Sequence, residues 1–153
     1  MIQKSDIPEN AIKYSQNESK ISFSENGRIY AADNSTKKCV LGFKVDGGLI
    51  TSQKTKKCDY SLVVNNDLCY LIELKGQDVG TACKQLLITM EYFLLNYEIQ
   101  KFVGRIVISH YNTHKLNDEN YRSLQRKLRV ITKQFGITQN SLIIKENKLK
   151  EKI

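Results

Sequence analysis

The segment from Asp59 to Lys75, DYSLVVNNDLCYLIELK, constrains the fold of this chain more than any other stretch. Side chains alternate between the two faces of a strand, so Glu73 and Lys75 point together and Leu74 points away. If residues 65–67 form a three-residue hairpin loop, Asp59 lies opposite Glu73 on the neighbouring strand. Directly opposed residues have Cβ atoms roughly 5 Å apart, which allows two carboxylates to bind one divalent cation. A one-residue change of register would aim the two acids at different faces.

Short apolar runs, broken by clusters of Asn, Asp, Gly or Lys, predict further strands on both sides of this hairpin. GRIYAA, KKCVLGFKVDGG and LITS come before it, and FVGRIVIS and SLIIK come after it. FVGRIVIS is almost continuously apolar, which is typical of a buried strand. In KVDGG, Gly47 and Gly48 suit the positive φ of a hairpin turn, while Asp46 is alternatively another acid near the site.

Three helices are predicted between and before these strands. The stretch from Ile7 to Lys20 is polar with scattered apolar positions, which indicates a helix starting at Pro8. After Gly76 the apolar spacing becomes helical, and Asp78 is placed to cap a helix with a broad apolar face. A further helix is expected from about residue 117 to 135. Strand, helix and strand in succession predict right-handed crossovers onto a mixed sheet flanked by helices, an α/β fold.

The size and composition indicate one domain spanning residues 1–153. A chain of 153 residues and 17.6 kDa can bury a core, and one Pro and eight Gly leave little material for linkers. Residues 146–153 are predicted to be a lysine-rich tail. The four cysteines form no CxxC pair and suit buried thiols, and MIQKSDIPEN has no apolar signal core, so a cytoplasmic location is expected. No run approaches the roughly 18 apolar residues of a membrane-spanning helix.

The formal net charge of +8 and the pI near 9.3 favour an anionic partner, most simply nucleic acid. The lysine-rich end contributes to this charge without needing to touch a partner.

Asp59 followed by Glu73, Leu74 and Lys75, on adjacent strands with a helix after them, resembles the PD-(D/E)XK nuclease superfamily, whose fold is restriction-endonuclease-like. The resemblance covers residues 38–109. It implies an αβββαβ core, here with an additional helix and strand. It also implies that Asp59 and Glu73 bind Mg²⁺ or Mn²⁺, that the carbonyl of Leu74 joins the metal shell, and that Lys75 assists the attacking water.

The same resemblance suggests further site residues. Gln85, in the helix after the motif, resembles the polar residue that several branches place beside the metal or the scissile phosphate, although a helical glutamine is most often solvated. Many members add a glutamate from the first helix, and Glu9, Glu18 and Glu25 all remain open for that role. Cys58 stands where the motif name has proline, a position that varies widely in this group.

These residue types suit phosphodiester hydrolysis. Mg²⁺ held by one or two carboxylates, with waters completing its shell, neutralises phosphoryl charge and supplies hydroxide at neutral pH. A lysine on the same face can position that water or stabilise the anionic transition state. The alternative is that Glu73 and Lys75 simply face water at a strand edge, as charges on strands usually do. The upstream Asp59, the apolar residue between the two charges and the helix after Gly76 together favour the metal site.

Two other features have both a functional and a purely structural interpretation. The helix near residues 117–135 carries a basic stripe, spaced 4, 3 and 4, which either contacts nucleic-acid phosphates or is merely the solvated face of an amphipathic helix. The stripe consists of Arg122, Arg126, Arg129 and Lys133. His110 and His114 are four apart, a spacing that suits zinc on a helix, but their context resembles a loop, and a rim or solvent position is favoured.

The sequence therefore predicts a Mg²⁺-dependent deoxyribonuclease, an endonuclease that acts on DNA in preference to RNA. Lacking an evident target-reading domain, it would act on a DNA structure, as a homodimer, or with a specificity-giving protein partner. One alternative is a non-catalytic nucleic-acid-binding or regulatory protein that keeps the nuclease fold. Another is a protein-interaction component of a mobile-element or defence system with nuclease ancestry.

Overall fold

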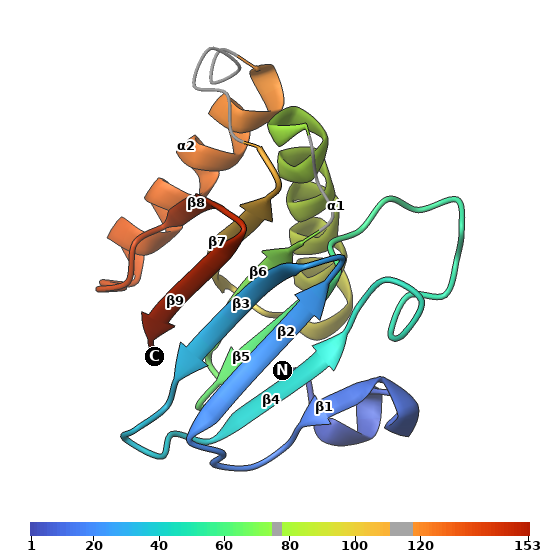
Figure 1. Ribbon diagram of the computed structural model, residues 1–153, viewed down its shortest axis with the longest axis vertical. Coiled ribbons are helices and arrows are strands. Elements are labelled where there is room, and N and C mark those ends of the chain that lie inside the picture. The colour runs from blue at the N-terminus through green and yellow to red at the C-terminus, as the bar shows by residue number, and fades with distance from the viewer. Residues whose placement is uncertain (75–77, 111–117) are drawn as a thin grey trace.

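The computed structural model describes residues 1–74, 78–110 and 118–153, which form a mixed α/β fold with two α-helices and two mixed sheets (Figure 1). The larger sheet has the strand order β1-β4-β5-β6-β7-β8. Its strands are β1 (Ile12–Tyr14), β4 (Val40–Lys44), β5 (Tyr60–Val64), β6 (Leu68–Glu73), β7 (Lys101–Ile108) and β8 (Leu142–Glu146). The smaller sheet has the order β2-β3-β9, with β2 (Lys20–Glu25), β3 (Arg28–Asp33) and β9 (Lys148–Lys152).

The elements stack in three layers, seen in Figure 1 with β2, β3 and β9 in front of the larger sheet and both helices behind it. Helices α1 (Val79–Tyr97) and α2 (Glu119–Gln134) cover one face, where the core includes Val63 and Leu71. The small sheet covers the other face, where the core includes Leu62 and Tyr70. Both faces of β5 and β6 are therefore buried, and alternation along each strand assigns its side chains to one core or the other.

The β5–β6 hairpin has the predicted register. Val64 pairs with Leu68, and residues 65–67 form the connecting loop. Asn65 and Asn66 both adopt positive φ, which asparagine tolerates better than most residues and which matches the strand twist at a tight hairpin. The ladder continues through the pair of Tyr60 with Ile72. One more step along the same register sets Asp59 against Glu73.

Strand direction and helix position confirm the predicted α/β class, a mixed sheet with helices against it. Strands β6, β7 and β8 are parallel, and each successive pair is connected through a helix. Asp78 caps α1, with its Oδ1 accepting from the Gly80 amide at 3.0 Å. Gly104 in β7 lies where both helices meet the sheet, and a Cβ there would come within 2.9 Å of Leu142 and 3.1 Å of Leu128. Its lack of a side chain lets the helices pack closely.

The first predicted helix is wrong. The stretch 7–20 contains the 3₁₀ turn Glu9–Ala11 and then β1, and the 3₁₀ turn Lys4–Asp6 precedes it. β1 pairs with β4 instead, and a short polar segment with few apolar side chains to bury gains little stability as a helix. The αβββαβ succession thus lacks its leading α-helix within the described residues. The LITS run is also not a strand; it contributes only an isolated bridge between Asp46 and Ile50.

The predicted lysine-rich tail is wrong as well, because residues 148–152 form β9, parallel to β3. Leu149 and Ile153 are buried, whereas the three lysines between and beside them are exposed. Exposed lysines alternate with less exposed residues, as expected of a strand with one face toward solvent. The high lysine content of the segment hides this pattern. Among the described helices, none is long and apolar enough to cross a membrane.

Candidate functional site

Asp59 and Glu73 lie together at one end of the β5–β6 hairpin. Asp59 directly precedes β5, Glu73 is the last residue of β6, and their exposed fractions are 1% and 0%. Both share the strand face of Val63 and Leu71, the face covered by α1. Leu74 points to the opposite core, as alternation requires. The structure therefore brings the two predicted acids together.

The Asp59 carboxylate is held by the end of β6. Its Oδ2 accepts a hydrogen bond from the Leu74 amide at 2.8 Å. Its backbone carbonyl accepts from the Val45 amide at 2.8 Å, so the residue is also fastened to the chain just after β4. This hydrogen bond from a backbone N–H fixes the orientation of the carboxylate. Leu74 thus places its backbone directly beside Asp59.

Lys57 is a buried cation near this site that the sequence prediction missed. It is 5% exposed, its Nζ donates to the carbonyl of Ser52, and the same atom lies 3.6 Å from Asp46 Oδ1. Asp46 thereby helps to anchor the turn that follows β4. The positive φ predicted for the turn is confirmed at Gly47, with φ of 72°, but is wrong at Gly48, where glycine is needed because a Cβ would collide with the Lys44 carbonyl. A signal was present in the sequence, since Lys57 stands two residues before Asp59.

Gln85 and Thr89 reach from α1 to the chain just before Asp59. Gln85 Nε2 donates to the carbonyl of Lys57 at 3.1 Å. The Thr89 hydroxyl accepts from the Cys58 amide at 2.9 Å and donates to the carbonyl of Gln85 at 2.8 Å. Gln85 therefore lies close to the site, as the resemblance implied, but its amide group contacts backbone. The sequence prediction did not include Thr89.

The cysteine beside the acid is not suited to nucleophilic chemistry. Burial raises the pKa of the Cys58 thiol well above its ordinary value, and the nearby negative charges of Glu73 and Asp59 raise it further. A thiol with a raised pKa stays protonated near neutral pH, and the thiolate is the reactive form. Cys58 is a packing residue.

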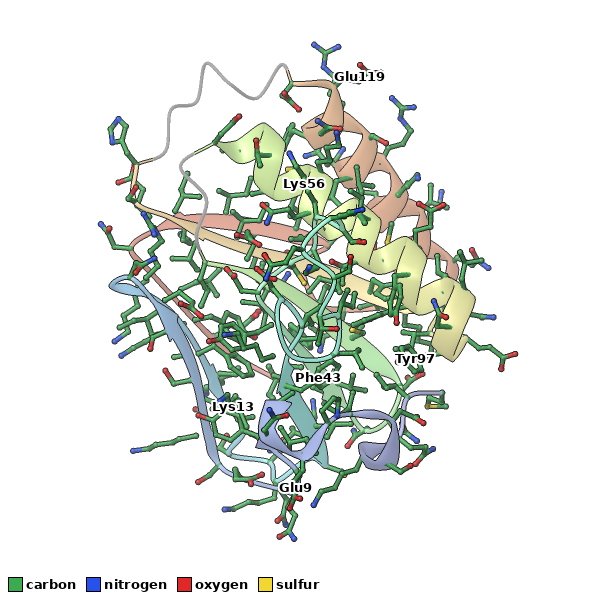
Figure 2. All side chains as sticks on the ribbon, turned by 90° about the vertical axis from the view of Figure 1, so that its right-hand side faces the viewer. Glu9, Lys13, Phe43, Lys56, Tyr97 and Glu119 are labelled. Carbon is green, nitrogen blue, oxygen red and sulfur yellow. The ribbon has the colours of Figure 1, made fainter. Side chains whose placement is uncertain are left out.

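The three N-terminal glutamates do not join the acids. Glu25 accepts a hydrogen bond from the Tyr60 hydroxyl at 2.7 Å, on the face of β5 opposite to Asp59. Glu18 accepts from the amide of Gln16 at 3.1 Å. Glu9 is exposed, and Figure 2 shows it well away from Lys56, which precedes the site in the chain.

The structure describes only some of the remaining predicted residues. Lys75 and His114 fall outside the described residues. His110 is exposed, with Nδ1 4.0 Å from Glu146 Oε1. The basic stripe is confirmed as a surface feature, since Arg122, Arg126, Arg129 and Lys133 are all exposed. Leu124 and Leu128 form the buried side of the same helix.

The donor set fits a hard divalent cation. Within residues 1–74, 78–110 and 118–153, no group of three or more His, Cys, Asp or Glu side chains is arranged to hold a metal ion. A site that requires three such side chains, as catalytic zinc usually does, has no candidate there. Mg²⁺ differs, because it keeps several waters and commonly uses one or two carboxylates. Asp59, Glu73 and the adjacent backbone can provide that smaller set.

No protein-family model, curated protein or solved structure matches this chain.

Proposed function

We propose that this protein is a metal-dependent nuclease that hydrolyses DNA phosphodiester bonds, with Asp59 and Glu73 holding Mg²⁺ or Mn²⁺. The observation that carries the proposal is the pair of buried carboxylates, 1% and 0% exposed, side by side on one face of neighbouring strands. Burying one carboxylate is unfavourable, and burying two of them together adds their mutual repulsion. A divalent cation bound between them would offset both terms, and this supports a metal site.

The roles follow from the chemistry of each group. The bound ion would neutralise phosphoryl charge and lower the pKa of a coordinated water. Asp59, oriented by the Leu74 amide at 2.8 Å, and Glu73 would hold it. The Leu74 carbonyl would complete the protein ligands, and the Lys75 ammonium would orient the attacking water or stabilise developing negative charge.

Element order supports the same proposal. Strands β4, β5 and β6, helix α1 and strand β7 follow one another in the βββαβ order that the resemblance to the nuclease superfamily implies, with Asp59 directly before β5 and Glu73 at the end of β6. The exposed basic residues of α2 and the net charge of +8 suit a polyanionic substrate.

The test is a cleavage assay with matched variants. The purified chain is incubated with supercoiled, linear and single-stranded DNA and with RNA, in Mg²⁺, Mn²⁺ or EDTA. We expect metal-dependent DNA cleavage, reduced roughly 100-fold or more by Asp59→Asn or Glu73→Gln, because each substitution removes a charged ligand. Asp33→Asn, at an exposed acid on the small sheet, is the control and keeps activity.

Two outcomes would reject the enzyme. Cleavage that survives both substitutions would belong to a contaminant or to another site. Salt-sensitive DNA binding without cleavage under any metal condition would favour the alternative, a non-catalytic nucleic-acid-binding or regulatory protein with this fold.

A further inference from the structure

The chain immediately before Asp59 is held by α1 rather than by the sheet. The β5–β6 ladder begins with the pair of Tyr60 and Ile72, so residues 57 and 58 lie outside β5. Their backbone groups instead meet side chains of α1. The carbonyl of Lys57 accepts from Gln85 Nε2, and the amide of Cys58 donates to Thr89 Oγ1.

Thr89 is fully buried, and its hydroxyl is engaged on both sides. The hydroxyl donates its proton to the Gln85 carbonyl one helical turn earlier, at 2.8 Å, which directs an oxygen lone pair toward the Cys58 amide, at 2.9 Å. A threonine bonded back to the i−4 carbonyl has a fixed hydroxyl orientation. The hydroxyl is therefore a rigid acceptor for the peptide unit that precedes the acid.

The side chain of Lys57 also holds the segment before Asp59 in place. Its ammonium donates to the Ser52 carbonyl and lies 3.6 Å from Asp46, so the incoming loop is tied to the turn after β4. The backbone leading into Asp59 is thus fixed by α1 on one side and by this loop on the other.

We propose that Thr89 and Gln85 are positioning residues for Asp59, which set the affinity of the site for its cation without touching the cation. This inference rests on the proposed function. Mg²⁺ requires near-ideal octahedral geometry, so small displacements of one carboxylate weaken binding. Groups that orient ligands commonly change metal affinity by roughly 10- to 100-fold when removed.

The decisive variant is Thr89→Val, which keeps the branched shape but loses the acceptor. Mn²⁺ binding to the full chain is measured by titration calorimetry in the absence of DNA. We expect Thr89→Val to weaken Mn²⁺ binding by about tenfold. Thr89→Ser, which keeps the hydroxyl, should bind Mn²⁺ as tightly as the unmodified chain. The control is Thr132→Val in α2, where a threonine makes the same kind of helix-backbone bond, at 3.0 Å to the Arg129 carbonyl, away from the acids.

A purely structural role for Thr89 gives a different result. It would lower the melting temperature of Thr89→Val while leaving the Mn²⁺ dissociation constant unchanged, and that outcome would overturn the inference. If Thr89→Val fails to fold, the test uses Gln85→Met instead. Gln85 is only half-buried and Met has a similar length, so this variant should fold. Unchanged Mn²⁺ affinity in a folded Gln85→Met would then overturn the inference.

The proposed function can fail separately. If the unmodified chain binds no Mn²⁺, the metal-dependent nuclease is rejected and the positioning role falls with it. If the unmodified chain binds Mn²⁺ and cleaves DNA, yet Thr89→Val and Gln85→Met bind the ion equally well, only the positioning role is wrong.

Discussion

Arg105 is the largest fully buried side chain among the described residues, and its guanidinium joins the two sheets. Nε and Nη2 donate to the two carboxylate oxygens of Glu151 in β9, at 2.6 and 3.0 Å. Nη1 donates to the carbonyls of Gly104 and Asn140. The tyrosine rings of Tyr30 and Tyr70 border this pair, with Tyr30 Oη donating to Glu151 at 2.8 Å and the guanidinium 5.2 Å from the Tyr70 ring centre. A buried charge is tolerated here because both partners are present and hydrogen-bonded.

The two tyrosines make the molecule sensitive to alkaline pH. Burial, and next the charge of Glu151, raises the pKa of Tyr70 to about 12, against a lowering by Arg105, and burial also raises the pKa of Tyr30 well above 10.0. Between an unfolded-state pKa near 10 and the folded-state value, the unfolded chain releases protons that the native protein keeps. Stability is therefore complete below pH 10 and falls above it, by up to about 1.4 kcal/mol per pH unit for each group.

Tyr70→Phe and Tyr30→Phe separate this titration from hydrogen bonding. The Tyr70 hydroxyl makes no hydrogen bond with a described residue, so Tyr70→Phe should change stability little at neutral pH but reduce the alkaline loss. Tyr30→Phe removes a bond to a carboxylate and should destabilise by about 1.5–3 kcal/mol at neutral pH. Urea unfolding over a pH series measures both effects. An alkaline slope unchanged in both variants would contradict the assignment.

At the scale of elements, β9 has the largest unanticipated role. It pairs with β3, contributes Leu149 and Ile153 to the second core, and supplies Glu151 to Arg105. A segment with these contacts is part of the folded unit, although composition predicted a lysine-rich tail.

Deletion of residues 147–153 should therefore unfold or severely destabilise the protein. The deletion leaves Arg105 buried without Glu151, and removal of one partner of a buried ion pair costs about 3–5 kcal/mol before the reduced apolar burial is added. That is a large part of the total stability of a domain. Circular dichroism and thermal unfolding measure the result. Replacement of Lys148, Lys150 and Lys152 by Gln is the control and should retain the fold, since all three are exposed. A deletion variant with the parent melting temperature would refute the role of β9.

At the scale of the whole molecule, two groups of exposed basic residues lie on different layers and could meet the proposed polyanionic substrate. One is the basic stripe of α2, on the helical layer, and the other is the outer face of the small sheet, where Lys148 and Lys150 are exposed. Net charge alone cannot tell which surface meets a polyanion. The stripe belongs to the layer that covers the face of the acids, which favours it as the phosphate-binding surface.

Arg129→Gln with Lys133→Gln tests the stripe. DNA affinity is measured over a salt series in the Glu73→Gln background, where cleavage is suppressed. We expect weaker binding and a slope of log affinity against log salt that is shallower by about 0.9 for each DNA phosphate that the variant no longer neutralises. Lys148→Gln with Lys150→Gln removes the same charge from the small sheet and should leave the slope unchanged. Equal effects of the two pairs would mean that affinity follows total charge instead of the stripe.

The sequence by itself determined the elements whose pattern is local and strong. The three-residue loop and the alternation in β5 and β6 predicted the register that sets Asp59 against Glu73, and the helical spacing with Asp78 predicted α1. These predictions succeeded because loop length and alternation depend only on neighbouring residues, and a one-residue shift would have moved every side chain of β5 or β6 from one core to the other.

Only the tertiary structure decided the rest, because the deciding contacts join residues far apart in the chain. The N-terminal stretch became β1 by pairing with β4, and the lysine-rich end became β9 by pairing with β3 and by the bond of Glu151 to Arg105, 46 residues away. Likewise Thr89 reaches the Cys58 amide across 31 residues of sequence. Local periodicity reports how a segment divides its side chains between water and core, but the partner that receives each side chain is fixed only when distant elements pack.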